Sequence, residues 1–498
     1  MRFLLRAFGG FLFICLVLVA VGGGWAAWRW SQSEANDKAA DDPAHLAAKH
    51  RYLTEIARDF GPGGSQHIAE NARPNLVVIL FDDLGWGDIG AYGNKAIATP
   101  AMDGLAENGA RFTHYFSPAP YCTPSRAGLL TGRLPVRTNL TQVTFPDGSL
   151  LNGVMRIAGA GLRLPRHEIT LPEILGAAGY RTAMIGKWHL GAGKGAEPMD
   201  FGFERYFGVL HSNDMEPLPL YRDRRVVEEH PIDQTTLTAR YTNEAGRAIK
   251  DFSASGKPFF LYFAHTFPHI PLYAPAEKRG QSKAGLYGDV VEELDRSVAG
   301  VMAALTQAGV ADNTIVIITS DNGPWYEGAA GPVRGRKNET LEGGQRVPFI
   351  VHWPARVAAG QVVNGLSMGT DLVPTMLNLL QLPAPDDRVL DGKDVAAHWF
   401  DGAASPHEKL WLNRASEIQA MRTPTHKLRD KAPVYGGTTV GPALAYAPPM
   451  GPMLFNLEID PTESYDASDH EPAMREKLET ELRAMQKQIE DNPKGWRN

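Results

Sequence analysis

Five short apolar runs, each about as long as a β-strand, alternate with helical patterns along the middle of the chain. They are Leu76–Phe81, Thr182–Ile185, Phe259–Phe263, Ile315–Thr319 and Val347–Val351. Most of them are rich in β-branched or aromatic residues, which favour buried strands. The alternation predicts an α/β fold in which helices cover both faces of a mostly parallel sheet. We place this domain over residues 74–402.

The composition is that of a globular protein without a strong charge bias. Hydrophobic residues make up 43% and charged residues 21% of the 498 residues, which excludes a collagen-like, coiled-coil or disordered chain. The formal net charge of −6 provides no basic surface for nucleic acid, so we expect no nucleic-acid partner. The only two cysteines, Cys15 and Cys122, cannot build a disulfide framework.

The first 30 residues contain a stretch that is long enough to cross a membrane. The 22 residues from Ala7 to Trp28 carry no charge and match the length of a spanning helix. The basic residues Arg2 and Arg6 and the small residues at 22–24 and 26 also fit a cleavable secretory signal. We favour an uncleaved anchor because the full span is uncharged and tryptophans lie near its end like an interfacial belt, at Trp25, Trp28 and Trp30.

Both interpretations export the rest of the chain. The protein would be anchored with its body facing the periplasm or the extracellular side, or secreted if residues 1–26 are cleaved. Residues 31–73 are polar and are typical of a stalk or linker. Within them, Ala44–Phe60 has the pattern of a short amphipathic helix that Gly61-Pro62-Gly63-Gly64 would end.

Polar side chains follow four of the five predicted strands. Asp82-Asp83 follows the first, Gly186–His189 the second, His265 and His269 the third, and Ser320–Asn322 the fourth. Ligands of open α/β sheets bind outside the carboxyl ends of the strands. We therefore expect these carboxylates, amides, histidines and lysines to meet at one rim of the sheet.

Four of these residues suit a metal ion. Asp82, Asp83, Asp321 and Asn322 offer only oxygen ligands, which a hard cation prefers. We predict a Ca²⁺ site, with Mg²⁺ as the less favoured ion.

The segment Tyr121–Arg133 has the most specific pattern in the chain. Cys122, Pro124 and Arg126 form a Cys-x-Pro-x-Arg motif that a glycine-containing helical stretch follows. The motif resembles the signature of the sulfatase family. The resemblance implies that a formylglycine-generating enzyme oxidises Cys122 to Cα-formylglycine, whose hydrate is the nucleophile and also contacts the metal.

The resemblance extends from about Pro74 to His470, with its motifs in the family's order. Asn75–Asp88 and Ser320–Gly323 are similar to the family's two metal loops. Other matching segments favour His269 over His265 and imply these catalytic residues beside Cys122: Arg126, Lys187, His189, His269 and Lys337.

The resemblance also implies a role for each of these groups. The hydrate attacks sulfur, and His189 is the base for collapse of the resulting sulfate ester. His269 and Lys337 hold the sulfate and help to protonate the leaving oxygen, while Arg126 and Lys187 orient the hydrate. A serine could not complete this cycle because it has no second hydroxyl to deprotonate.

The fold implied by the family is alkaline-phosphatase-like, with a smaller C-terminal α+β subdomain. Residues 403–498 would form it, as a short antiparallel sheet with a charged helix from about Pro472 to Ile489. Thr438–Pro452, rich in Gly, Pro and Ala, is either a loop in the wall of the cleft or a flexible connector.

The expected function is that of a sulfuric ester hydrolase acting on aryl or saccharide sulfates. The body is most similar to the arylsulfatase A and N-acetylgalactosamine-6-sulfatase branch. Asp147–His167 and His211–Arg222 are expected to shape the mouth of the pocket. Two alternatives remain open: a phosphonate or phosphate monoester hydrolase of the same superfamily, and a non-catalytic membrane-tethered binding protein.

Overall fold

The computed structural model describes residues 41–66, 68, 73–157, 161–430 and 451–497. The proposed anchor over residues 7–28 and most of the proposed loop Thr438–Pro452 lie outside the described residues. Among the described helices, none is both long enough and apolar enough to span a membrane.

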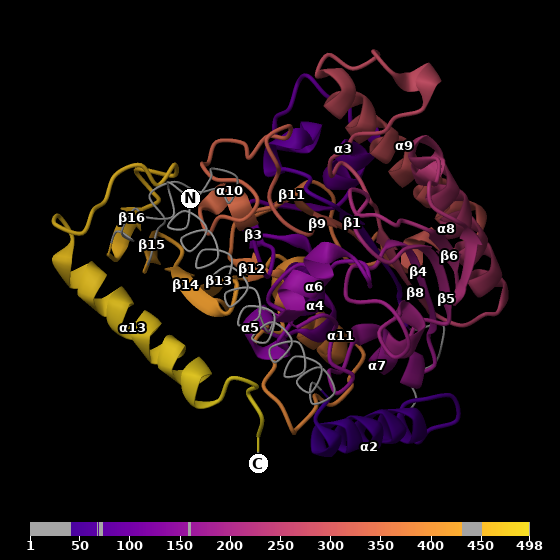
Figure 1. The fold of residues 1–498 in the computed structure, drawn as a ribbon, viewed down its shortest axis with the longest axis horizontal. Helices are drawn as coiled ribbons and strands as arrows, with labels where there is room; N and C mark the ends of the chain where they lie inside the picture. The colour runs from indigo at the N-terminus through magenta and orange to yellow at the C-terminus, as the bar shows by residue number, and fades with distance from the viewer. Residues whose placement is uncertain (1–40, 67, 69–72, 158–160, 431–450, 498) are drawn as a thin grey trace, which may run out of the picture.

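A ten-stranded sheet forms the body of the protein (Figure 1), in the order β11-β2-β10-β9-β1-β8-β4-β5-β6-β7. Its parallel centre consists of β9 (Thr314–Ser320), β1 (Asn75–Phe81), β8 (Phe259–Ala264), β4 (Arg181–Lys187) and β5 (Arg205–Val209). The outer strands are β10 (Phe349–His352), β2 (Ala110–Phe112), β11 (Gln361–Val363), β6 (Leu220–Arg222) and β7 (Arg225–Glu228). The predicted α/β fold is confirmed, although β10, the last of the five predicted strands, runs antiparallel to β9.

Helices cover both faces of the sheet because alternate strand residues point to opposite sides. In β1, Leu76, Val78 and Leu80 enter one core, while the residues between them enter the other. The second core also includes residues of α3 (Pro100–Glu107), α8 (Leu237–Ala254) and α9 (Gly285–Gln307), which lie along one side of the molecule in Figure 1. The first core includes residues of α2 (Pro43–Asp59), α4 (Cys122–Thr131), α7 (Leu171–Ala177), α11 (Leu372–Leu379) and α12 (Ala396–Phe400).

Short elements occupy several connections between the larger ones. They are the helices α5 (Pro135–Thr138), α6 (Leu150–Ile157) and α10 (Glu342–Gln345), and the two-stranded sheet of β3 (Tyr115–Phe116) and β12 (Ser367–Met368).

The helix predicted within the polar stalk exists as α2, and it packs on the catalytic body. The Asp42 carboxylate caps its first turn by accepting from the backbone N–H groups of Ala44 and His45. Lys49 Nζ lies 2.5 Å from Glu173 Oε1 and donates to the backbone carbonyl of Glu168 at 2.7 Å. This part of the segment is therefore fixed to α7 and its neighbouring loop.

The C-terminal part forms a separate small subdomain, as predicted. Its antiparallel sheet has the order β13-β14-β15-β16, with bounds Leu410–Arg414, Glu417–Arg422, His426–Arg429 and Met453–Asn456. Helix α13 (Pro472–Asp491) packs against this sheet through Leu478, Leu482 and Met485, which share a core with Leu412 and Leu428.

Buried charges join this subdomain to the catalytic body. Glu342 of α10 lies 3.2 Å from Lys427 Nζ on β15 and 3.5 Å from Arg422 Nη2 on β14. Lys427 also lies 3.2 Å from Glu463, and the four side chains are at most 3% exposed. Burial disfavours the charged form of Glu342, but Arg422 and Lys427 outweigh it and lower the pKa of this carboxyl to about 2.

We expect Glu342→Gln to lower the free energy of unfolding by about 3 kcal/mol at neutral pH, because it leaves buried cations with one partner fewer. The wild-type carboxylate contributes stability above its ordinary pKa of 4.5 and loses it as the pH falls toward 2. Denaturant unfolding should therefore show a stability gap between the two proteins that narrows from pH 7 to pH 3.5. A gap that stays constant with pH would contradict this role, and Glu204→Gln, which removes a 40% exposed carboxylate, is the control.

Candidate active site

Four neighbouring parallel strands bring the predicted site residues together. β1 lies between β9 and β8, and β4 pairs with the other edge of β8. Their carboxyl ends therefore meet at one rim, where Asp82-Asp83, Lys187, His269 and Asp321-Asn322 converge. Gly186 permits the close approach of β4 to β8 at this rim, since a Cβ there would lie 1.7 Å from the Ala264 carbonyl oxygen of β8.

Cys122 lies at the centre of this rim. It is the first residue of α4 and is 1% exposed. Its Sγ donates to Asp82 Oδ1 at 3.4 Å. Potential ligand atoms of Asp82, Cys122 and Asp321 lie within 4.8 Å of one another, as do those of Asp83, Cys122 and His269. The thiol position is thus in contact with the predicted metal ligands.

The predicted metal ligands fit a hard cation. Asp82, Asp83 and Asp321 are at most 2% exposed, and buried Asn322 Oδ1 has no hydrogen-bond partner among the described residues. Burial and the adjacent Asp82 raise the pKa of Asp321 to about 7. A cation would relieve this crowding of carboxylates and satisfy the amide oxygen.

Two basic side chains, Arg126 and Lys187, bond to the carboxylates of Asp321 and Asp82. Arg126, four residues after Cys122 on α4, donates its Nε to Asp321 Oδ2 at 2.9 Å and its Nη1 to the Lys187 carbonyl oxygen at 2.6 Å. Lys187 Nζ donates to Asp82 Oδ2 and, at 3.0 Å, to Ser212 Oγ. The arginine therefore links the cysteine helix to both β4 and the loop after β9.

Lys337 reaches the site from a long loop. Its Nζ lies 2.8 Å from Asp83 Oδ1 and 2.9 Å from Oδ2. Burial opposes the ammonium charge, but Asp83 outweighs it, so the pKa of Lys337 lies above its ordinary value. Backbone bonds from Lys337 to Pro324 and from Asn338 to Pro120 fix this loop beside the cysteine segment.

His189 is buried in the site as a neutral imidazole. It is fully buried, and burial together with the nearby Lys187 lowers its pKa well below the ordinary value. Its Nε2 lies 3.1 Å from the Thr144 carbonyl oxygen, so Nε2 carries the proton and donates. Nδ1 has no partner among the described residues and keeps its lone pair.

His269 also lies in the site, whereas His265 does not. The Nδ1 of His269 lies 2.5 Å from the Ile270 carbonyl oxygen and 3.1 Å from Asn213 Oδ1, while its Nε2 is 3.7 Å from Asp83 Oδ2. His265 stacks against Phe81 and bonds Ser297 within the core. The preference for His269 over His265 agrees with this geometry.

The sequence interpretation missed three contributors to this site. Ser212 contacts Lys187, Asn213 contacts His269, and the Thr144 carbonyl orients His189. Ser212 and Asn213 had been assigned only to the mouth of the pocket. They follow β5, a parallel strand that we did not predict; its apolar residues Tyr206, Phe207 and Val209 were the available signal.

Comparisons with known proteins agree with the fold and the motifs. The Sulfatase family model matches residues 74–382. Bovine arylsulfatase A is 36% identical over 443 residues, which cover 81% of this chain and 85% of the relative. Rat N-acetylgalactosamine-6-sulfatase is 40% identical over 350 residues, which cover 66% of each chain, just under two thirds of the rat protein.

Solved structures give the same result. A sulfatase from Pseudoalteromonas sp. superposes with a TM-score of 0.75 at 27% identity, over 91% of this chain and 96% of that one. The phosphonate monoester hydrolase of Agrobacterium radiobacter shares the fold alone, with a TM-score of 0.60 at 17% identity over 84% and 96% of the two chains. Since the family model covers more than half of the chain and arylsulfatase A aligns over most of its own length, the protein belongs to the sulfatase family.

Proposed function

We propose that the protein hydrolyses sulfate monoesters of carbohydrates or aryl alcohols through a formylglycine made from Cys122. The observation that carries the proposal is the position of Cys122 at the start of α4, in contact with Asp82 and within reach of His269. A cysteine with a purely structural role would not require three carboxylates, two histidines and two lysines around it. The Cys-x-Pro-x-Arg motif that begins at Cys122 also matches the family signature in which this cysteine is oxidised to an aldehyde.

The proposed reaction splits hydrolysis into two steps. Water adds to the aldehyde to give a hydrate with two hydroxyl groups. One hydroxyl oxygen attacks sulfur, the S–O bond to the alcohol breaks, and the alcohol leaves with a proton. The second hydroxyl then loses its proton, the aldehyde re-forms, and the bond between the residue and sulfate breaks. The sum is one ester and one water converted to one alcohol and one sulfate.

The surrounding side chains are suited to move these protons. His189, with a neutral imidazole and a free Nδ1 lone pair, would take the proton of the second hydroxyl. Lys337 stays cationic and would bind the sulfate oxygens and protonate the leaving oxygen. His269, whose Nε2 lies 3.7 Å from Asp83 Oδ2, would share these roles when its ring is protonated, because burial and Lys337 lower its pKa in the free site. Arg126 and Lys187 hold Asp321 and Asp82 in place and orient the nucleophile.

A calcium ion fits the oxygen ligands of this site. Asp82, Asp83, Asp321 and Asn322 would hold it together with the oxidised residue 122. When bound, it would supply positive charge that offsets the negative charge developing on the sulfate oxygens.

The names of the relatives support a class of substrate for this enzyme. Related proteins are named for N-acetylgalactosamine-6-sulfate and aryl sulfate substrates. We infer a sulfated saccharide or aryl ester as substrate, and a host formylglycine-generating enzyme as the maturation partner.

We also propose that the uncharged segment 7–28 exports the body of the protein and anchors it in the membrane. The mass of the mature N-terminal peptide in the membrane fraction decides between an anchor and a cleaved signal.

The function is tested by comparing paired esters with the purified, calcium-replete protein. We expect kcat/KM for an aryl sulfate to exceed that for the matching aryl phosphonate by about 100-fold or more, because the site is proposed to stabilise the transfer of a sulfate group. The two esters have the same leaving group, so the ratio of their kcat/KM values depends only on the transferred group. A preference for the phosphonate would overturn the proposal in favour of the alternative hydrolase. No turnover of either ester, with an unmodified thiol at residue 122, would favour a binding protein.

A further inference from the structure

The proposed catalytic site opens to solvent on the side of Lys337 and His269. The side chains of these two residues are 11% and 10% exposed, whereas Cys122 and His189 are at most 1% exposed. The loop that carries Lys337 therefore borders the opening through which a substrate reaches the nucleophile.

Three arginines gather where this loop meets the C-terminal subdomain. Arg334 lies on the loop itself, three residues before Lys337. Arg414 and Arg429 are the last residues of β13 and β15. Both strands run antiparallel to β14, which lies between them, so these two arginines are at the same end of the small sheet.

Arg414 lies next to both segments that carry proposed catalytic residues. Its Nε donates to the carbonyl oxygen of Asn338, the residue after Lys337, at 2.8 Å. The backbone N–H of Ala415 donates to Tyr121 Oη at 2.6 Å, and Tyr121 directly precedes the nucleophile in the sequence. A group bound by Arg414 would therefore lie beside the catalytic centre.

The three guanidinium groups form no ion pair with a carboxylate among the residues that the structure describes. Arg334 and Arg414 donate to backbone carbonyl oxygens, while Arg429 is 6% exposed and its Nε is buried without a hydrogen-bond partner. Burial lowers the pKa of Arg429 below its ordinary value, although Glu463 and Glu339 favour its charge. The positive charges of Arg334 and Arg414 add to this shift, so the three cations repel one another.

The two carboxylates that act on Arg429 have other partners. Glu463 lies 3.2 Å from Lys427, and Glu339 accepts from the backbone N–H of Arg336 at 3.0 Å. Residues 431–450, which lie outside the described part of the chain, include no aspartate or glutamate. A buried guanidinium without a counter-ion is costly, so the cluster is suited to an anion that a ligand supplies.

We propose that Arg334, Arg414 and Arg429 bind a second anionic group of the substrate, a carboxylate or a sulfate on the ring next to the sulfated ring. The inference rests on the proposed function and adds a substrate class to it, that of polyanionic saccharides. Guanidinium groups are planar and donate paired N–H groups to the oxygens of such anions. The anion would also relieve the repulsion among the three arginines.

The test compares disaccharides that share one sulfated ring and differ only in the neighbouring ring. This neighbour is a neutral hexose, the corresponding hexuronate, or the hexose with a sulfate of its own. Both linkage directions are included, and loss of sulfate from the shared ring is followed by NMR. In the wild-type protein we expect kcat/KM to favour at least one anionic neighbour over the neutral one by about tenfold or more. The larger of the two ratios identifies the anion.

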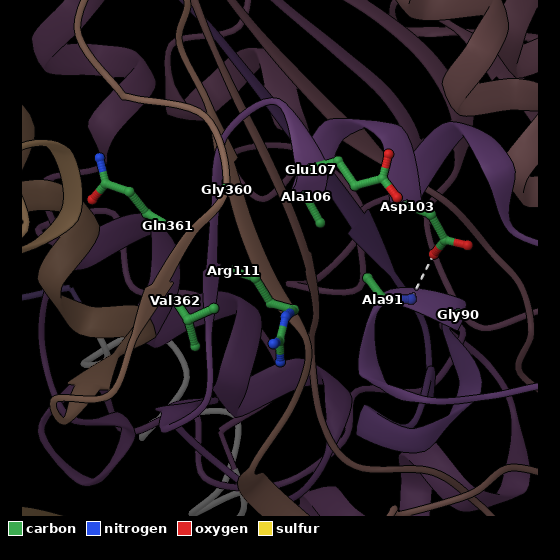
Figure 2. A pocket seen from close by; sticks show the side chains of 9 residues that line it. All are labelled: Gly90, Ala91, Asp103, Ala106, Glu107, Arg111, Gly360, Gln361 and Val362. Atoms are coloured by element: carbon green, nitrogen blue, oxygen red, sulfur yellow. Dashed lines mark hydrogen bonds between the residues drawn. The ribbon is translucent and has the colours of Figure 1, made fainter.

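In the double variant Arg414→Gln, Arg429→Gln, this preference should fall toward one. The readout is a ratio, so a loss of activity common to all substrates does not enter it. The matched control removes an arginine from a separate pocket of about 310 Å³ between α3 and β11, where Figure 2 shows Arg111 with Asp103 and Glu107. Arg111→Gln should leave the ratio at the wild-type value, because that pocket includes none of the three arginines.

Thermal unfolding tests whether Arg429 has a structural role instead. Arg429→Met removes a buried charge that has no ion pair among the described residues, so the Tm should stay at or above the wild-type value. A Tm below that of the wild type would show that the guanidinium stabilises the fold, and would overturn its assignment to a ligand.

The outcomes separate this inference from the function on which it rests. A wild-type ratio near one, a ratio that the double variant does not change, or turnover of aryl sulfates without turnover of any disaccharide would overturn the polyanion proposal alone. Failure of the wild-type protein on every sulfate ester would overturn the proposed function instead.

Discussion

Protein with Cys122→Ser is expected to release at most one equivalent of alcohol per enzyme and then to stop. A serine hydroxyl at this position lies at the start of α4 beside Asp82, so it can attack sulfur once. The resulting sulfate ester has no second hydroxyl whose deprotonation would expel sulfate. Steady-state kcat should therefore fall by about 10⁴-fold or more.

Two measurements check this expectation. A rapid-mixing assay should show a burst without a following steady state, and the mass of peptide Phe112–Arg126 should include a retained sulfate. The same peptide from wild-type protein, purified from its own host, should contain an aldehyde at residue 122. Continuous turnover by the serine variant at the wild-type rate would contradict the formylglycine mechanism.

Apolar runs in the sequence predicted four strands of the parallel centre and β10, but they missed β5 and the other outer strands. β1, β8 and β9 are long, fully buried runs, and buried parallel strands show this unbroken apolar pattern. β2, β6 and β11 have only three residues each, which is too short for a periodic signal. The direction of β10 depends on how the chain crosses the sheet, and no local pattern encodes that.

The site residues could be predicted where a motif directly follows a predicted strand. Asp82, Lys187 and Asp321 are in that position, at the ends of β1, β4 and β9. The network among them could not be predicted: that Arg126 joins Asp321 to the Lys187 carbonyl requires the packing of α4 against the rim. Thr144 lies in an irregular loop, so its contact with His189 left no trace in the sequence pattern.

The polar segment before the body shows how composition alone can mislead about packing. Residues 43–59 are polar enough to suggest a free linker, yet α2 is fixed to α7 by the buried amino group of Lys49. Long charged side chains can bury their stems while the charge is paired, so a low mean hydropathy does not exclude docking.

Loss of Asp321 is expected to abolish both turnover and calcium binding. Asp321→Ala should lower kcat/KM by about 10³-fold or more, and Asp82→Ala should do the same, because each removes one of the buried oxygen ligands proposed for calcium. Asp321→Ala also leaves the fully buried Arg126 without its closest carboxylate partner, which destabilises the fold by about 3–5 kcal/mol. Asp321→Asn keeps the shape of the side chain and separates the two effects.

Thermal unfolding with and without calcium provides a readout that does not depend on activity. Calcium at about 100 times its dissociation constant should stabilise the wild-type protein by about 2.7 kcal/mol and stabilise Asp321→Asn much less. Asp251→Asn, which removes a 52% exposed carboxylate paired with Arg205, should behave like wild type. If Asp321→Asn keeps both full activity and the wild-type response to calcium, these residues do not form the metal site. If activity is lost while the calcium response remains, Asp321 acts on Arg126 and the nucleophile rather than on the metal.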